Sequence, residues 1–155
     1  MADTVTFDMS GLNRKIAAVK KAADQAAKAA VDYAISEFTR EVARNLSGIR
    51  HKPGTPSPTP GQLPVSIIMS QLRRSIKIKR LSPVIGIVYA DSKVAPYARY
   101  VHDGTNWTKK YKNKSVKIIM KKRPFMTAAV QAKKELILKQ FKAILKERIQ
   151  EAGQA

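Results

Sequence analysis

Two short groups of polar residues have types and spacings used in catalysis, but each lacks a necessary partner. Asp91-Ser92-Lys93 has the acid-x-lysine spacing of metal-dependent nucleases, in which carboxylates hold Mg²⁺ near a scissile phosphate and lysine stabilises the developing charge. Such a site needs further carboxylates, and only Asp103 lies in the same region. His102-Asp103 with a serine would form a hydrolytic set, but adjacent residues usually point apart, and no Gly-x-Ser-x-Gly elbow is present. We therefore predict that the protein is not an enzyme.

The sequence also offers few candidate residues for metal binding, redox chemistry or membrane insertion. The chain has no cysteine, which removes disulfides and thiolate metal sites. Its two histidines, His51 and His102, are too few for a zinc site unless carboxylates or a second subunit contribute. No apolar run approaches the roughly 18 residues of a membrane span, and we expect a soluble, intracellular product. We predict no catalytic, cofactor-binding or metal-binding residues and no cofactor.

Lysine and arginine are the residues whose pattern indicates binding. Residues 1–41 carry six basic and six acidic side chains and residues 135–155 four and three, which leaves +18 of the net charge of +19 for residues 42–134. Such a segment favours a polyanion or an acidic protein surface as neighbour, although a solvated basic face is the simpler alternative. The predicted contact residues for DNA or a partner protein are Arg73, Arg74, Lys77, Lys79, Lys109, Lys110, Lys112, Lys114, Lys117, Lys121 and Lys122.

Any contact with DNA is predicted to be independent of base sequence. The basic side chains occur in short runs, which suits phosphate contacts that salt weakens. Trp107 and Tyr111 lie among the lysines and would stack on single-stranded bases. No helix-turn-helix, zinc-finger or RNA-recognition motif is present. A small basic protein that binds DNA non-specifically is one of the two functions that we consider.

Two long helices are predicted to frame the basic region. Residues 12–46 carry one apolar stripe at alternating steps of four and three, with Ser10 or Asn13 to cap the start and Gly48 to end the helix. At ~1.5 Å per residue this helix would be roughly 50 Å long. Its first half is faced mainly with alanine, so we expect another part of the chain or another subunit to cover it. The second helix is predicted from about Pro124 to Gln150.

The middle of the chain is predicted to form a loop and a small sheet. Residues 50–64 hold five prolines and two glycines, which indicates an exposed loop that serves as a linker or as a docking arm. Ser75–Lys79 alternates apolar and basic residues, and Val84–Ala90 is predicted to pair with it. Val116–Met120 is predicted as a third strand.

The remaining middle segments are predicted to connect these strands. Residues 66–72 are predicted as a helical turn, 95–101 as a short helix or turn and 109–114 as a polar basic loop. The architecture is α+β and a single domain over 1–155. A long N-terminal helix (within 1–48) and a C-terminal helix (124–150) pack on a small, mostly antiparallel β-sheet (66–122), with the Pro-rich loop (50–64) exposed.

Three further motifs follow the first helix in order along the chain. They are Pro53–Pro64 with Leu72-Arg73-Arg74-Ser75-Ile76, then Tyr97-Ala98-Arg99-Tyr100-Val101-His102-Asp103-Gly104-Thr105, then Arg123-Pro124-Phe125-Met126. This order resembles the small neck and tail-completion proteins of long-tailed bacteriophages, which include head–tail joining and minor tail proteins. That family more often has glutamate and an aromatic residue where this chain has His102-Asp103.

The resemblance implies a structural virion protein. It would complete the neck or the head-proximal end of the tail and mediate head–tail joining as part of a ring, commonly of six copies, around the DNA channel. Its partners would be copies of itself and neighbouring neck, connector, tail-terminator or tail-tube proteins, with possible non-specific contact to DNA and none to membrane. It would reside in the virion, and in the host cytoplasm during assembly.

The motif residues are predicted to act as fold or interface anchors. Tyr97 and Tyr100 are expected in the core or at an interface, and Gly104 is expected to supply a positive φ after Val101. Phe125 and Met126 are predicted to plug the start of the last helix into the sheet. Arg123, which precedes Pro124, is predicted to donate hydrogen bonds to a carboxylate or to carbonyls.

Overall fold

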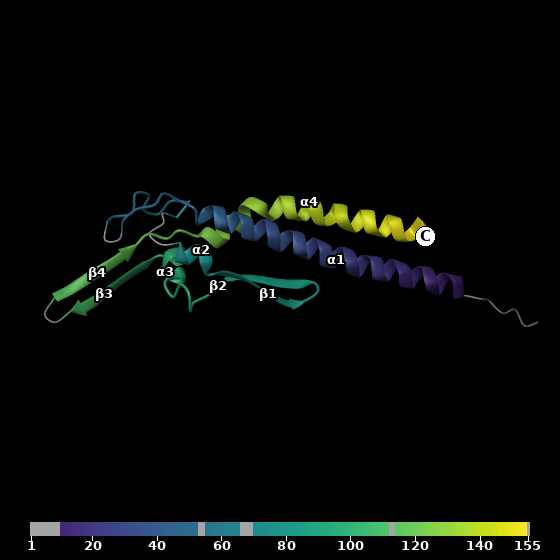
Figure 1. Ribbon diagram of the computed structural model, residues 1–155, viewed down its shortest axis with the longest axis horizontal. Coiled ribbons are helices and arrows are strands. Elements are labelled where there is room, and N and C mark those ends of the chain that lie inside the picture. The colour runs from purple at the N-terminus through teal and green to yellow at the C-terminus, as the bar shows by residue number, and fades with distance from the viewer. Residues whose placement is uncertain (1–9, 53–54, 66–69, 112–113, 155) are drawn as a thin grey trace, which may run out of the picture.

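The computed structural model describes residues 10–52, 55–65, 70–111 and 114–154, which form an elongated α+β domain. Its elements in chain order are α1 (Ser10–Asn45), α2 (Gln71–Arg74), β1 (Ile76–Ser82), β2 (Ile85–Ala90), α3 (Ala98–Asp103), β3 (Thr105–Tyr111), β4 (Lys114–Met120) and α4 (Phe125–Gln154). The predicted fold class, with a long helix towards each end of the chain, is confirmed. Helices α1 and α4 lie side by side and antiparallel (Figure 1).

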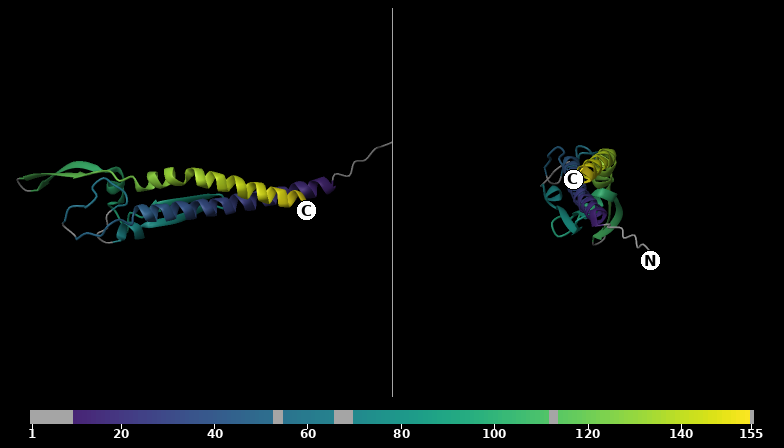
Figure 2. Two further views of the ribbon diagram at one scale, coloured as in Figure 1. Left: turned by 90° about the horizontal axis from the view of Figure 1, so that it is seen from above. Right: turned by 90° about the vertical axis from the view of Figure 1, so that its right-hand side faces the viewer.

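The strands form two separate hairpins, whereas the sequence analysis predicted one small sheet. β1 pairs with β2 and β3 with β4, both antiparallel, and neither hairpin hydrogen-bonds to the other. The β1–β2 hairpin runs along α1, and the β3–β4 hairpin projects beyond the end of the helix pair (Figures 1 and 2). The predicted pairing of the first two strands is confirmed, as is the strand that ends at Met120.

The prediction of a loop over residues 109–114 is wrong, because β3 continues to Tyr111. In β3 the consecutive residues Lys109 and Lys110 follow Trp107 and Thr108, and β4 supplies the partner strand that the local sequence does not reveal. Of the predicted helical turn over 66–72, residues 66–69 lie outside the described part of the chain, and α2 begins at Gln71. The short helix predicted near 95–101 is α3, which starts at Ala98.

The hydrophobic core lies at one end of the helix pair, where α1, α3 and α4 meet. Phe125 and Ala129 of α4 are fully buried there. They belong to one cluster of buried side chains with Val42, Leu46, Val65, Leu72, Ala95, Ala98 and Val101. Asn45 Nδ2 donates a hydrogen bond to the Phe125 carbonyl oxygen at 2.9 Å and so joins the end of α1 to the start of α4. The predicted plug is confirmed for Phe125, while Met126 is half-buried against the same cluster.

Burial decreases along both helices away from this core. Ala26 and Ala30 of α1 are buried, but Leu12 and Ile16 are exposed. On α4 the side chains of Leu136 and Ile149 are exposed as well. Two helices in contact cover only one narrow stripe of each other, so the remaining apolar residues face outward.

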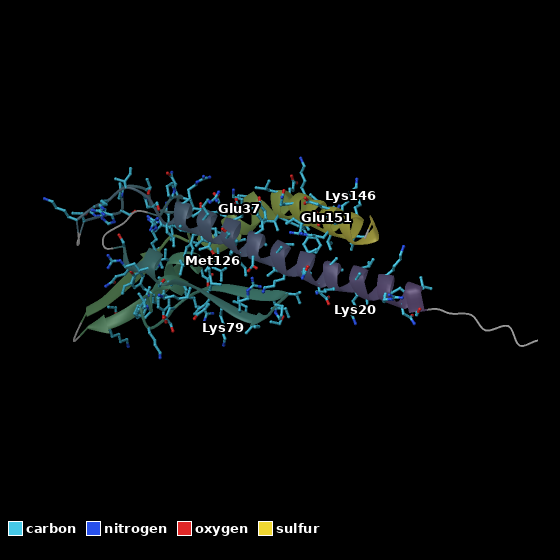
Figure 3. All side chains as sticks on the ribbon, turned by 45° about the vertical axis from the view of Figure 1, so that its right-hand side comes forward. Lys20, Glu37, Lys79, Met126, Lys146 and Glu151 are labelled. Carbon is cyan, nitrogen blue, oxygen red and sulfur yellow. The ribbon has the colours of Figure 1, made fainter. Side chains whose placement is uncertain are left out.

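A buried ion cluster holds the two helices together. Lys133 of α4 donates a hydrogen bond from Nζ to Glu37 Oε2 at 3.1 Å and lies 3.7 Å from Glu41 Oε2, and both glutamates are buried on α1. Glu37 lies where α1 faces α4 (Figure 3). The hydrogen bond from Lys133 holds the pKa of Glu37 below its ordinary value, with Arg40 adding to the effect. These charges pair only when α1 and α4 are in their native register.

The β1–β2 hairpin approaches α1 closely at a glycine. A Cβ on Gly86 would lie 2.1 Å from Ile35 Cδ1, so a larger residue there would require the Ile35 side chain to move. Arg80 forms an ion pair with Asp32 of α1 beside this contact. The strand register puts Gly86 opposite Arg80 and on the same face of the hairpin as Val88 and Ile78. Because Gly86 contacts α1, this face of the hairpin is the one turned towards the helix.

Two other glycines serve different purposes. Gly48 was predicted to end the first helix, but α1 ends at Asn45 and the φ of Gly48 is not positive. Instead its N–H donates to the Val65 carbonyl at 3.0 Å, where a Cβ would lie 2.5 Å from that oxygen. Gly104 has φ +77°, which confirms the predicted positive φ, and a Cβ there would lie 2.8 Å from the Lys122 backbone nitrogen. It lets β3 start directly after α3.

We predict that Phe125→Ala and Gly104→Val each lower the melting temperature. Removing a fully buried phenylalanine costs about 3–5 kcal/mol, which corresponds to roughly 10 °C in a domain of this size. Gly104→Val combines an unfavourable φ with a backbone clash and should cost at least about 5 °C. Leu138→Ala, at an exposed position of α4, should move the transition by no more than about 2 °C. Differential scanning calorimetry measures all three, and unchanged transitions for both core variants would refute this placement.

We also predict that the Glu37–Lys133 contact makes stability depend on pH. Because the folded-state pKa of Glu37 is lowered, its contribution is complete above the ordinary value of 4.5 and is lost as pH falls through the lower folded value. Glu37→Gln should therefore destabilise the protein at pH 7, and the difference should shrink towards pH 2.5. Urea titrations across this range measure it, with Glu151→Gln, in an exposed pair with Arg148, as the control. A difference that is constant with pH would contradict the prediction.

Candidate interaction surface

The predicted contact residues of the first hairpin lie together on its outward face. The register puts Lys77 opposite Tyr89 and Lys79 opposite Ile87, all four of them exposed. Figure 3 shows Lys79 on the side of the hairpin away from the helix pair. The lysines of β1 thus share one face as predicted, but β2 adds the apolar side chains of Tyr89 and Ile87 to it, so that face is not purely basic. Arg73 and Arg74, in the last turn of α2, are exposed just before this strand begins.

The second hairpin carries a mixed apolar and basic surface that the rest of the chain leaves open. Ile119 is 64% exposed on the same face of the hairpin as the exposed Lys110 and Lys117, whereas Trp107, which is 47% exposed, lies on the opposite face. Lys109 and Lys114 are on β3 and β4, but their side chains, like that of Tyr111, are outside the described part, and so is Lys112 as a whole. Lys121 and Lys122 follow β4 and are exposed. The hairpin is anchored at its base, where Met120 packs against the core.

An isolated two-stranded hairpin has little stability of its own in water. The main contacts of β3 and β4 are with each other, and the pair extends away from the body of the molecule (Figures 1 and 2). Ile119 would lose contact with water if a second surface covered the face that it shares with Lys110 and Lys117, and such burial is the usual driving force for association. A covering surface would therefore stabilise the projecting hairpin.

Arg123 is buried, unlike the lysines before it, and connects the Pro-rich loop to the start of α4. Its Nη2 donates hydrogen bonds to Ser57 Oγ at 2.7 Å and to the Thr59 carbonyl at 3.1 Å. The predicted bonding to a carbonyl is confirmed. Burial lowers the pKa of the Arg123 guanidinium. Pro124, predicted as the first helical residue, directly precedes α4 and accepts a bond at its carbonyl from the Ala128 N–H.

The two tyrosines of the Tyr-Ala-x-Tyr motif are on the surface of the monomer. Tyr97 is 36% exposed and Tyr100 53%, so neither belongs to the core. Burial of part of its ring raises the pKa of Tyr97. Their role as interface anchors stays a prediction.

Three polar side chains meet between α3 and α4, those of Asp103, His102 and Thr127. The sequence analysis expected the adjacent His102 and Asp103 to point apart. His102 Nδ1 donates to Asp103 Oδ1 at 2.7 Å, and this bond holds the pKa of Asp103 below its ordinary value. His102 Nε2 is 3.4 Å from Thr127 Oγ1, and its ring packs edge-on against Phe125. The carboxylate–imidazole–hydroxyl order matches that of hydrolases, but 3.4 Å is long for proton transfer. The arrangement instead joins α3 to the first turn of α4.

The Asp91-Ser92-Lys93 segment forms a local turn. Asp91 Oδ1 accepts a hydrogen bond from the Lys93 N–H at 2.9 Å, as an Asx turn does. Within the described ranges no cluster of three histidine or acidic side chains suits a metal ion. The helices described there include none that is long and apolar enough to cross a bilayer.

Sequence reasoning missed the buried charges. Glu37 and Glu41 fall on the same helical face as Ala26 and Ala30, a signal that could have placed them against another helix. Their partner Lys133 carries no such signal, because it is one of many lysines. Ser57, which accepts the Arg123 bond, comes from a loop more than sixty residues earlier.

Among known proteins, no family model, no curated protein and no solved structure matches this chain.

Proposed function

We propose that this protein is a structural component of a long-tailed phage virion that acts through contact rather than catalysis. It completes the neck or the head-proximal end of the tail and joins head to tail as one subunit of a ring, with six copies the expected number, around the DNA channel. The observation that carries the proposal is the projecting, uncovered β3–β4 hairpin with its basic and apolar surface. The order of the three motifs after the first helix supports it.

Charge supports an acidic neighbour for this end of the molecule. The two acidic residues between positions 42 and 134 are Asp91 and Asp103, and both have partners within the chain. Within the described part of the subunit, Lys110 and Lys117 form no ion pair with a carboxylate. An acidic surface on an adjoining connector or tail protein would supply one and would also cover Ile119 on the same face.

The opposite end of the molecule suits contact with a further copy. The first turns of α1 and the last turns of α4 lie together there (Figure 1). Leu12, Ile16 and Ile149 are exposed on them, in helices that carry less net charge than residues 46–124. Exposed apolar side chains favour association, so neighbouring subunits of a ring would meet through the helices while the hairpins face another layer.

Non-specific DNA binding is the second candidate. The outward face of β1–β2 presents Lys77 and Lys79 beside the exposed ring of Tyr89. Lysines next to an aromatic ring suit phosphate contact with stacking on a base. This function would require an affinity in the micromolar range at physiological salt that decreases steeply as salt is raised.

We predict that reversing charge on the projecting hairpin abolishes assembly without unfolding the protein. Lys110→Glu with Lys117→Glu places two carboxylates on one face of this hairpin, opposite the proposed acidic neighbour. In a phage or prophage lacking the gene, complementation with this variant should lower infectious titre at least about tenfold. The control is Lys139→Glu with Lys146→Glu, the same change of charge at exposed positions of α4.

Circular dichroism should show native helix content for both double variants. Equal complementation by the two would contradict a docking role for the hairpin. If the hairpin variant fails and also loses micromolar DNA binding in a gel shift at physiological salt, the DNA-binding function would be favoured instead.

A further inference from the structure

A cavity of about 640 Å³ lies under the Pro-rich loop. Apolar side chains from three elements line it, among them Leu72 of α2, Val101 of α3 and Met120 of β4. Three cationic side chains, Arg73, Lys121 and Arg123, also line it. It is large enough for two or three amino-acid side chains, and it combines apolar walls with positive charge.

Arg123 is a buried cation that has no anionic partner among the residues that the structure describes. Arg123 is only 9% exposed, and the two acceptors of its hydrogen bonds, Ser57 Oγ and the Thr59 carbonyl oxygen, are both uncharged. Its Nε is buried and has no hydrogen-bond partner in the described part of the structure. A buried charge normally has an ionic partner, because leaving water is otherwise costly.

No described carboxylate is among the hydrogen-bond or ion-pair partners of Arg123. Asp91 and Asp103 are the two acidic residues of the middle region, and they bond to Lys93 and His102. Glu37 and Glu41, the buried acids of α1, pair with Lys133. The Nε–H of Arg123 is thus the donor left for an anion from outside the subunit, which would enter through the cavity that this side chain lines.

We propose that this cavity binds a carboxylate carried on an apolar peptide segment of a partner protein. The carboxylate pairs with the Arg123 guanidinium, which presents planar N–H donors suited to it, while the flanking apolar side chains pack on Leu72, Val101 and Met120. Lys121 and Arg73 add attraction for the approaching acid. A DNA phosphate would satisfy the charge but would leave the apolar walls uncovered.

The inference rests on the cavity alone and does not require the virion role. The β3–β4 double variant described above leaves every lining residue in place, so failure of one proposal is distinguishable from failure of the other.

The test uses two capped tetrapeptides that differ only in charge, acetyl-Leu-Glu-Phe-Ala-amide and acetyl-Leu-Gln-Phe-Ala-amide. Each is titrated into the full-length ¹⁵N-labelled protein, and the Arg123 Nε–H signal is followed by NMR. The glutamate peptide should shift this signal downfield and bind at least about tenfold more tightly than the glutamine peptide. Equal binding, or no movement of the Arg123 signal with either peptide, would overturn the proposal.

Variants separate the charge of Arg123 from its structural role. Arg123→Lys keeps the charge and should retain part of the preference for glutamate, whereas Arg123→Met should lose it. Arg148→Met, which removes an exposed arginine of α4, should keep the full preference. If Arg123→Met does not fold, the wild-type Nε–H titration still decides. An equal shift with inorganic phosphate would show a general anion site and would overturn the assignment to a peptide carboxylate.

Discussion

The packing of α1 against the first turns of α4 is the constraint on which the rest of the structure depends. Phe125 and Ala129 enter the core there, Lys133 meets Glu37 one turn later, and Asn45 bonds to the Phe125 carbonyl. The β1–β2 hairpin lies on α1, and the base of the β3–β4 hairpin packs on the same cluster through Met120. Because all of these contacts meet at one end, the remainder of each element extends outward and exposes apolar surface.

This arrangement also distributes charge unevenly along the molecule. The two long helices carry 13 basic and seven acidic side chains, whereas residues 46–124 carry 17 basic and two acidic ones. Under the proposed function, a subunit that is much more basic at one end suits a layered assembly, in which like subunits meet through the helices and an acidic layer meets the hairpins. Arg123 brings part of the positive charge to the wall of the cavity proposed to bind a partner segment.

The sequence predicted those parts of the fold that follow from local pattern. The long apolar stripe located α1, the alternation at Ser75–Lys79 located β1 and its basic face, and the glycine after Val101 was correctly assigned a positive φ. β3 was missed because its lysines resemble a loop until β4 is known to lie beside it. The site around Arg123 could not be predicted either, since its acceptors and its lack of a carboxylate depend on segments far apart in the chain.

The central claim is that the protein joins two parts of a virus particle, and electron microscopy tests it most directly. The measurement compares particles made by a phage or prophage in which this gene is deleted with those made when it is restored. The account predicts DNA-filled heads beside unattached or abnormal tails in the absence of the gene. Normal, infectious, tailed particles would contradict it.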